Sequence, residues 1–395
     1  MPSSPTLPMP SETALQHSRA VQKVIQSEIN AADSWISFAH YMELALYAPG
    51  LGYYSGGATK FGSAGDFVTA PEISALFGRT LARQVMQLLT QVDNADILEF
   101  GAGSGKLALD LLLELERLAC LPKQYFILEV SAELRQRQRA LFENKVPHLV
   151  PLLSWLEQLP TQFNGVILAN EVLDAMPVHL VAWHDDQLFE RGITWKNDQF
   201  EWQTRPLHNQ VLLKVASKLT AQIHESNDPA NLYLSEISLA TRSFMHSVAD
   251  ILQHGAILLI DYGFGSSEYY HPQRNQGTLM CHYRHHSHDD PLYLPGLQDI
   301  TSHVDFSAVT EAAENSGLAL LGYTTQAHFL INCGITEILA QTPAEDVGNY
   351  FPLANQVQKL ANPSEMGELF KVIAFGRNIY GPLVGFTSGD KSRLL

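Results

Sequence analysis

The hydrophobic pattern along the chain changes from about residue 95 onward, where short apolar runs alternate with longer amphipathic stretches. We interpret the apolar runs as buried strands at residues 96–100, 124–129, 164–169 and 256–261. Apolar residues recur at helical spacing in the stretches 106–119, 132–142 and 238–252. Strands alternating with helices are typical of βαβ units, so the pattern predicts a parallel sheet covered by helices on both faces.

The N-terminal part of the chain is predicted to be helical. Helical spacing extends over residues 11–47, before Pro49-Gly50, and resumes from Glu72 to about Leu89. Between these helices, residues 50–72 are rich in glycine and lack a regular pattern. Because glycine and proline interrupt helices, we expect a helical cap followed by an irregular lid.

Further along the chain, two other patterns appear. Residues 178–204 alternate apolar and polar positions between Asp and Asn turn signals, which predicts an antiparallel insertion, and a helix follows at about 208–226. A helix at 305–315 precedes two apolar runs, 318–323 and 370–375. We expect these two runs to pair as the last strands of the sheet.

The predicted fold class is α/β, a Rossmann-like sheet with an N-terminal helical cap and β/helical insertions. A length of 395 residues fits two or three domains of about 150 residues, or one domain with insertions. The expected parts are a disordered lead at 1–10, the cap and lid at 11–92, the core at 93–376 with insertions at about 178–230 and 325–365, and a C-terminal tail at 377–395.

Composition and charge narrow the function classes. With 46% hydrophobic residues the chain can bury a core, which excludes intrinsic disorder. The 25 Lys and Arg against 41 Asp and Glu give a net charge of −16, which disfavours nucleic-acid binding and would attract a cationic side chain. The apolar stretches are shorter than the roughly 20 residues that span a bilayer, so no membrane insertion is expected.

Cysteine usage indicates a reducing compartment. Cys120, Cys281 and Cys333 are odd in number and form no CxxC pair, which argues against a disulfide framework or a zinc ribbon. Residues 1–10 have neither the apolar region of a secretory signal nor an arginine-rich transit pattern. We therefore expect a cytoplasmic protein.

The strongest local motif is a glycine-rich loop between a predicted strand and a predicted helix, Glu99-Phe-Gly-Ala-Gly-Ser-Gly-Lys106. A phosphate-binding Walker loop requires Ser or Thr after the lysine, but Leu107 stands there. A dinucleotide fingerprint requires glycine where Lys106 stands. The spacing therefore favours a compact ligand without a pyrophosphate, although a tight strand-to-helix turn without any ligand is an alternative.

S-adenosyl-L-methionine (SAM) fits this loop chemically, with S-adenosyl-L-homocysteine as its product. The helix N-terminus offers N–H groups to its carboxylate, Glu99 can attract its ammonium, and Glu129, at the end of the second strand, can accept the ribose hydroxyls. Trp155 can stack on the adenine, or it is an ordinary core residue. The other predicted cofactor contacts in these loops are Gly101, Ala102, Gly103, Ser104, Gly105, Val130 and Asn170.

Several long motifs resemble the MidA-type methyltransferases, a family that includes a mitochondrial assembly factor for respiratory complex I. The similar segments lie between about residues 37 and 376: residues 65–74, 99–105, 169–179, 277–284, 290–291, 299–306 and 370–374. The resemblance implies a class I SAM-dependent methyltransferase. It also implies methylation of arginine on a protein partner, including symmetric dimethylation, with a respiratory-complex subunit as the partner and complex I assembly as the process.

The catalytic residues are predicted at the end of the third strand, in Asn170-Glu171-Val-Leu-Asp174. Glu171 and Asp174 are three positions apart, so a helical turn would place both carboxylates on one face to hold a guanidinium or accept its proton. The alternative is that both carboxylates stabilise a helix N-terminus.

The predicted lid supplies further cofactor contacts through Asp66, Phe67, Thr69 and Pro71. Its alternative role is helix capping by Asp66 or Thr69.

A histidine-rich segment raises the question of a metal. His282, His285, His286 and His288 precede Asp289 and Asp290, and such side chains bind zinc or iron. Methyl transfer from SAM needs no metal, so we expect none. Tyr283, Arg284 and Asp290 are instead predicted to face the substrate, and His303 and Asp305 are either similar candidates or core hydrogen-bonding groups.

The sequence therefore predicts a SAM-dependent methyltransferase that acts on arginine side chains of a protein. Two alternatives stay open: the same chemistry on a small molecule or another side chain, or a SAM-binding assembly factor with little turnover.

Overall fold

The computed structural model describes residues 7–56, 68–226 and 228–395. These residues form two compact units. Unit 1 comprises the described residues of Met1–Phe67, Asp174–Ser243 and Phe264–Asp305, and unit 2 comprises Val68–Leu173, Phe244–Gly263 and Phe306–Leu395. The expected division at residues 92 and 376 differs from this one, because residues 68–92 and 377–395 both belong to unit 2.

Unit 2 is built on a sheet with the strand order β15-β16-β10-β5-β2-β3-β4. The strands from β10 to β4 are parallel, and β16 is antiparallel to both of its neighbours, β10 and β15. Their bounds are β2 (Asp96–Phe100), β3 (Tyr125–Leu128), β4 (Leu153–Leu156), β5 (Phe163–Asn170), β10 (Leu252–Phe264), β15 (Ala319–Thr325) and β16 (Phe370–Arg377). The predicted parallel sheet and its closing strand pair are confirmed, whereas the short strand β4 was not predicted.

The helices that the sequence predicts for unit 2 are confirmed apart from one break. The helix expected from Glu72 to Leu89 is interrupted at Ser74, whose backbone is extended and whose hydroxyl accepts the N–H of Leu76 at 3.2 Å to cap the second part. The helices are α3 (Ala70–Ile73), α4 (Ala75–Leu89), α5 (Lys106–Arg117), α6 (Ala132–Lys145), η1 (Pro147–Leu152), α10 (Phe306–Asn315), α11 (Gln326–Asn332), α12 (Ile335–Leu339), α13 (Val347–Ala361), α14 (Met366–Leu369), η3 (Val384–Phe386) and η4 (Ser392–Leu394).

The core of unit 2 lies on the parallel strands. Ile97 on β2, Val166 on β5 and Leu258 on β10 are fully buried, and Leu111 of α5 packs in the same cluster. Each such side chain contributes about 1.5–3 kcal/mol by burial. Because strands buried on both faces are apolar throughout, the sequence pattern located them well.

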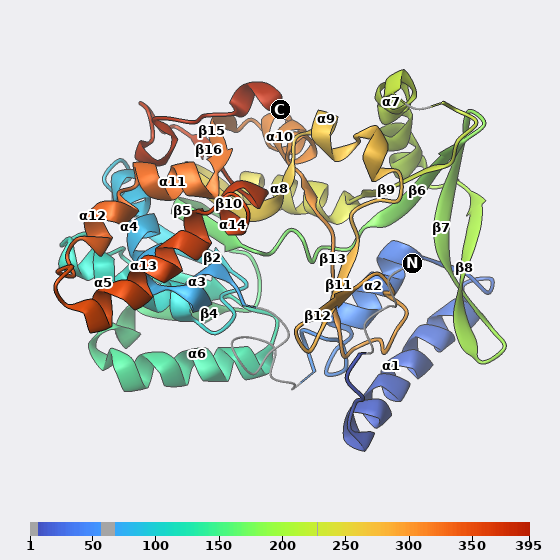
Figure 1. The fold of residues 1–395 in the computed structure, drawn as a ribbon, viewed down its shortest axis with the longest axis horizontal. Coiled ribbons are helices and arrows are strands. Elements are labelled where there is room, and N and C mark those ends of the chain that lie inside the picture. The colour runs from blue at the N-terminus through green and yellow to red at the C-terminus, as the bar shows by residue number, and fades with distance from the viewer. Residues whose placement is uncertain (1–6, 57–67, 227) are drawn as a thin grey trace. The chain divides into compact units, whose positions relative to one another are not determined.

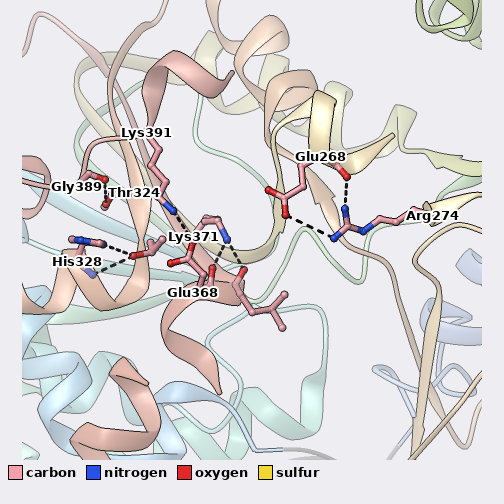
Figure 2. Close-up of polar contacts among 10 residues, drawn as sticks. Glu268, Arg274, Thr324, His328, Glu368, Lys371, Gly389 and Lys391 are labelled. Atoms are coloured by element: carbon pink, nitrogen blue, oxygen red, sulfur yellow. Dashed lines mark hydrogen bonds and ion pairs between the residues drawn. The ribbon is translucent and has the colours of Figure 1, made fainter. Parts of the chain in front are cut away.

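Residues 377–395, expected as a C-terminal tail, pack against the rest of unit 2. Leu383 and Phe386 join its core, and the rings of Phe386 and Phe329 are 5.6 Å apart. Figure 2 shows that the hydroxyl of Thr324 donates to the carbonyl of Gly389 and that Lys391 pairs with Glu368. The segment therefore completes the fold of unit 2.

Unit 1 contains the predicted antiparallel insertion. Its sheet has the order β1-β7-β6-β9, with β8 paired to β7, and β7 and β8 form a long hairpin (Figure 1). The strands are β1 (Ile36–Ser37), β6 (His179–His184), β7 (Gln187–Lys196), β8 (Gln199–Pro206) and β9 (Tyr233–Ile237). The predicted insertion is confirmed, and β1 and β9 are additions to it.

The single helix expected over residues 11–47 is wrong. It is divided into α1 (Glu12–Ala31) and α2 (Phe38–Tyr47), separated by the turn residues Asp33 and Ser34 with positive φ and by strand β1. Pairing of Ile36 and Ser37 with β7 takes this segment out of the helix. The interruption therefore comes from a tertiary contact that helical periodicity does not record.

The rest of unit 1 includes a small sheet with the order β12-β11-β13. The boundary between the units falls within α8 (Leu239–Ile251). The remaining elements are α7 (Gln210–Ser226), α9 (Ser266–Tyr269), η2 (Pro272–Arg274), β11 (Met280–Tyr283), β12 (His286–His288), β13 (Asp299–Thr301) and β14 (Val304–Asp305). Among the described residues, no helix has both the length and the apolarity needed to cross a lipid bilayer.

Candidate functional site

The strand order of unit 2 locates a binding site at the carboxyl ends of β2 and β5. From β2 the chain continues outward through β3 and β4, whereas β5 and β10 lie on the other side of β2. The loops after β2 and β5 are close together, since a Cβ added at Gly101 would lie 3.1 Å from Cγ2 of Val172. Open parallel sheets bind ligands at such a change of direction.

The glycine-rich loop after β2 has a backbone that requires glycine. Gly101, Gly103 and Gly105 have φ of +60°, +55° and +82°, in the left-handed region that other residues rarely adopt. Gly105 is also the N-cap of α5, which begins at Lys106. The loop thus has the conformation expected of a turn whose backbone approaches a ligand at a helix N-terminus.

Glu99 precedes this loop and carries an unusual carboxyl group. The side chain is buried, and the hydroxyl of Tyr125 donates to its Oε2 at 2.7 Å. Burial raises the pKa of Glu99 to about 7, the bond from Tyr125 opposes that rise, and Glu129 adds to it. The site therefore contains a buried acid that a bound cation would keep ionised.

Glu129 lies just after β3, as predicted, and is also buried. Its Oε1 accepts the N–H of Ser131 at 3.0 Å, and its Oε2 accepts Nε2 of Gln138 at 3.3 Å. These bonds hold the carboxylate at the edge of the sheet. The neighbouring Val130 is exposed, and its contact with the cofactor stays a prediction.

Trp155 lies within β4, paired with Ile127 of β3. Its Nε1 donates to Oε1 of Gln138 at 2.8 Å, and the guanidinium of Arg139 lies 4.9 Å from the centre of its ring. Trp155 thus lies beside the same strand end as Glu129, in agreement with either a stacking or a packing role.

The loop after β5 differs from the predicted helical turn. Glu171 has φ +54°, its N–H donates to the carbonyl of Ile260 at 2.8 Å, and no helix follows. Its Oε1 accepts the N–H of Ala70 at 3.3 Å and Nδ2 of Asn170 at 3.2 Å. The expectation that a helix aligns Glu171 with Asp174 is therefore wrong, and so is the alternative of helix capping.

Asp174 belongs to unit 1 and Glu171 to unit 2. The catalytic roles of both stay predictions.

Asp261, at the end of the β10 apolar run, is a residue that the sequence analysis missed. It is fully buried, and its Oδ2 accepts the N–H groups of Val172 at 3.2 Å and Leu173 at 2.9 Å. It therefore fixes the loop that carries Glu171. The available signal was a charged residue at the end of the apolar run predicted over residues 256–261.

Of the predicted lid, Asp66 and Phe67 lie outside the described residues, Thr69 directly precedes α3, and Pro71 is in its first turn. Thr69 occupies the N-cap position, but its side chain makes no capping bond, so the capping alternative is wrong for this residue. Glu72 of α3 instead accepts a hydrogen bond from the hydroxyl of Ser104. With the bond between Ala70 and Glu171, α3 contacts both loops of the site.

The histidine-rich segment lies in unit 1, on the hairpin of β11 and β12. Arg284 and His285 form its turn with positive φ, and burial lowers the pKa of His288. The ring of His303 stacks on Phe264 at 5.2 Å, which favours the core alternative for that residue. Within the described ranges, no group of three or more His, Cys, Asp or Glu side chains is arranged to hold a metal ion.

The residues present fit SAM. The buried carboxyl of Glu99 would hold the ammonium, Glu129 the ribose, and the N–H groups at the glycine-rich loop the amino-acid carboxylate. At the facing loop, the buried Oδ1 of Asn170 has no hydrogen-bond partner within the described part of the chain. A buried acceptor without a partner is costly and indicates a missing donor.

Comparison with known proteins gives consistent results. Residues 80–324 match the model of a family described as "Putative S-adenosyl-L-methionine-dependent methyltransferase". A crystal structure of a "likely methyl transferase from Burkholderia thailandensis bound to S-adenosyl-homocysteine" is 48% identical and has a TM-score of 0.94, covering 99% of this chain and 100% of that one.

Curated relatives are more distant. The chain is 28% identical to "Protein arginine methyltransferase NDUFAF7, mitochondrial" of Danio rerio in an alignment of 384 residues that covers 89% of this chain and 86% of the relative. It is also 28% identical to the protein of the same name from Homo sapiens over 380 residues, with coverages of 86% and 79%.

Proposed function

The chain belongs to this family of SAM-dependent methyltransferases, and from that premise we propose that it transfers a methyl group to arginine side chains of a protein partner. The predicted cofactor and enzyme class are thereby confirmed. The observation that supports the arginine substrate is the similarity, over 89% of the chain, to a relative named for protein arginine methylation.

The electrostatics of unit 2 suit this chemistry. SAM supplies a methyl group on a positively charged sulfur, and a guanidinium acceptor is also a cation. Glu99 and Asp261 lie near the carboxyl ends of β2 and β10, and Glu129 and Glu171 directly follow β3 and β5. A net charge of −16 favours the approach of a basic segment of a partner.

We assign Glu171 to hold the guanidinium and take up its proton. Its carboxylate is positioned by the left-handed backbone and by the bonds from Ala70 and Asn170. A carboxylate fixed in this way localises the lone pair of the attacking nitrogen and needs little reorganisation during transfer.

Methylation of a cell lysate tests the proposal. Wild-type enzyme and Glu171→Gln are incubated with methyl-labelled SAM and a lysate of a strain that lacks the protein, and labelled proteins are analysed by mass spectrometry. We expect monomethyl- and symmetric dimethylarginine only with the wild type. Label on a small molecule or on another side chain would refute the arginine substrate. Normal SAM binding without any labelled product would favour an assembly factor.

A respiratory-complex subunit is the partner class that we propose to examine first, in line with the resemblance seen in the sequence, and a role in complex I assembly would follow from it. The compartment proposed from cysteine usage is the cytoplasm. Fractionation of cells, followed by detection of the protein and its methylated partner in each fraction, tests both points.

A further inference from the structure

Gln138 is a polar residue at the centre of the buried face of α6. The buried side chains of this helix, Leu134, Gln138 and Phe142, follow each other at intervals of four residues. Gln138 is completely buried, although its neighbours on this stripe are apolar. Burial of an amide is unfavourable unless its polar atoms are hydrogen bonded, so its partners indicate its role.

The amide of Gln138 contacts the loop after β2, the residue that follows β3, and strand β4. Its Nε2 donates to the carbonyl of Gly103 at 2.9 Å and to Oε2 of Glu129 at 3.3 Å. Its Oε1 accepts Nε1 of Trp155 at 2.8 Å. The stem of Gln138 also packs closely on the loop, because a Cβ added at Gly105 would lie 3.1 Å from Cγ of Gln138.

These partners determine the orientation of the amide. The indole N–H can only donate, so it must face the amide oxygen. The carbonyl of Gly103 and the carboxylate of Glu129 can only accept, so both must face the amide nitrogen. Among side chains of this size, a carboxylate would repel Glu129 and an apolar group would satisfy none of the three partners.

We propose that Gln138 is the positioning residue of the cofactor site. It holds the glycine-rich loop, the carboxylate assigned to the ribose and the indole of Trp155 in one fixed geometry. The inference rests on the cofactor assignments of the proposed function but not on the identity of the methyl acceptor. Loss of the amide should therefore weaken SAM and S-adenosyl-homocysteine binding and leave acceptor recognition unchanged.

Calorimetric titration of the full chain with S-adenosyl-homocysteine tests the inference. We expect Gln138→Leu to bind about 10- to 30-fold more weakly than the wild type, and Trp155→Phe, which removes one of the three bonds, about 3- to 10-fold more weakly. Gln136→Leu is the matched control, because it makes the same substitution at an exposed position of the same helix. Its affinity should equal that of the wild type.

Gln138→Glu separates positioning from simple packing. Near pH 8 its carboxylate faces Glu129, and binding should be at least about 30-fold weaker than in the wild type. Near pH 6, partial protonation restores a donor, so the ratio of its dissociation constant to that of the wild type should fall. A structural role alone would not produce this pH dependence.

The inference is refuted if Gln138→Leu lowers the melting temperature but keeps its affinity within twofold of the wild type. If Gln138→Leu does not fold, two other results together refute the inference. These are an affinity of Trp155→Phe equal to that of the wild type, and a dissociation constant of Gln138→Glu whose ratio to the wild-type value does not change with pH. Wild-type binding of S-adenosyl-homocysteine without arginine methylation would instead contradict the proposed function and leave the role of Gln138 intact.

Discussion

Glu99 gives a prediction that calorimetry can test through the pH dependence of cofactor binding. Burial raises the pKa of this carboxyl to about 7, against an ordinary value of 4.5. If Glu99 pairs with the ammonium of SAM, the bound complex requires the ionised form. A protonated Glu99 must therefore release its proton when the cofactor binds.

The size of the effect follows from the pKa of about 7. Glu99 is ionised in about half of the unliganded molecules at pH 7 and in about a tenth of them at pH 6. Because apparent affinity is proportional to the competent fraction, it should fall about fivefold between pH 7 and pH 6. Binding should release about half a proton at pH 7 and about 0.9 proton at pH 6.

The assay is titration with S-adenosyl-homocysteine at both pH values in two buffers of different ionisation enthalpy, which yields the affinity and the number of protons released. In Glu99→Gln both the pH dependence and the proton release should disappear. Its affinity at pH 7 should be about 10- to 100-fold lower, the value of one charge-assisted hydrogen bond. Glu116→Gln, which changes an acid at the opposite end of α5, should behave like the wild type.

Glu99→Gln, which should weaken cofactor binding, should make the unliganded protein more stable. Because the pKa of Glu99 is raised in the folded state, its contribution to the free energy of unfolding is fully present below pH 4.5 and is lost as the pH rises through 7. The difference of about 2.5 pKa units corresponds to about 3 kcal/mol, so Glu99→Gln should be more stable than the wild type at pH 8 by up to this amount. If Glu99→Gln retains the pH-dependent affinity and the proton release of the wild type, Glu99 does not pair with the ammonium.

Three further predictions concern stability and turnover. Burial raises the pKa of Asp110 to about 6. Asp110→Asn should therefore raise the free energy of unfolding by about 1–2 kcal/mol at pH 8, seen as a higher melting temperature, but not at pH 4. An equal shift of the melting temperature at both pH values would contradict this cause. Glu171→Gln should keep its affinity for SAM within about twofold but lose about a hundredfold or more of methyl transfer, because its amide oxygen can still accept the N–H of Ala70; wild-type turnover would exclude the proposed role. Phe386→Ala should cost about 3 kcal/mol in thermal unfolding, whereas Lys391→Ala should cost less than about 1 kcal/mol. A loss below about 1 kcal/mol for Phe386→Ala would contradict core packing by its ring.

Much of unit 2 could be predicted from the sequence because its signals are local. Strands buried on both faces produce apolar runs, and a loop that needs left-handed backbone produces the spacing of Gly101, Gly103 and Gly105. The position of Glu129 at a strand end followed from the same pattern.

The errors have a common physical cause, which is that distant contacts override local preference. The pairing of Ile36 with β7 interrupts a helical pattern, and the backbone of Glu171 is held in a left-handed conformation by its bond to Ile260. Gln138 was missed because a glutamine in an amphipathic helix resembles a surface residue. Its role depends on Trp155, 17 positions away, and no periodicity records that distance.

Unit 2 is assembled from segments that are far apart in the chain, and this has a consequence for its biosynthesis. Its interior strand β10 pairs on one side with β5 and on the other with β16, which is synthesised more than a hundred residues later. During translation the nascent sheet therefore exposes an apolar, unpaired edge until residues 370–377 emerge. Molecular chaperones that shield such edges would be needed most in this interval, and ribosome stalling within it should increase aggregation of the newly made protein.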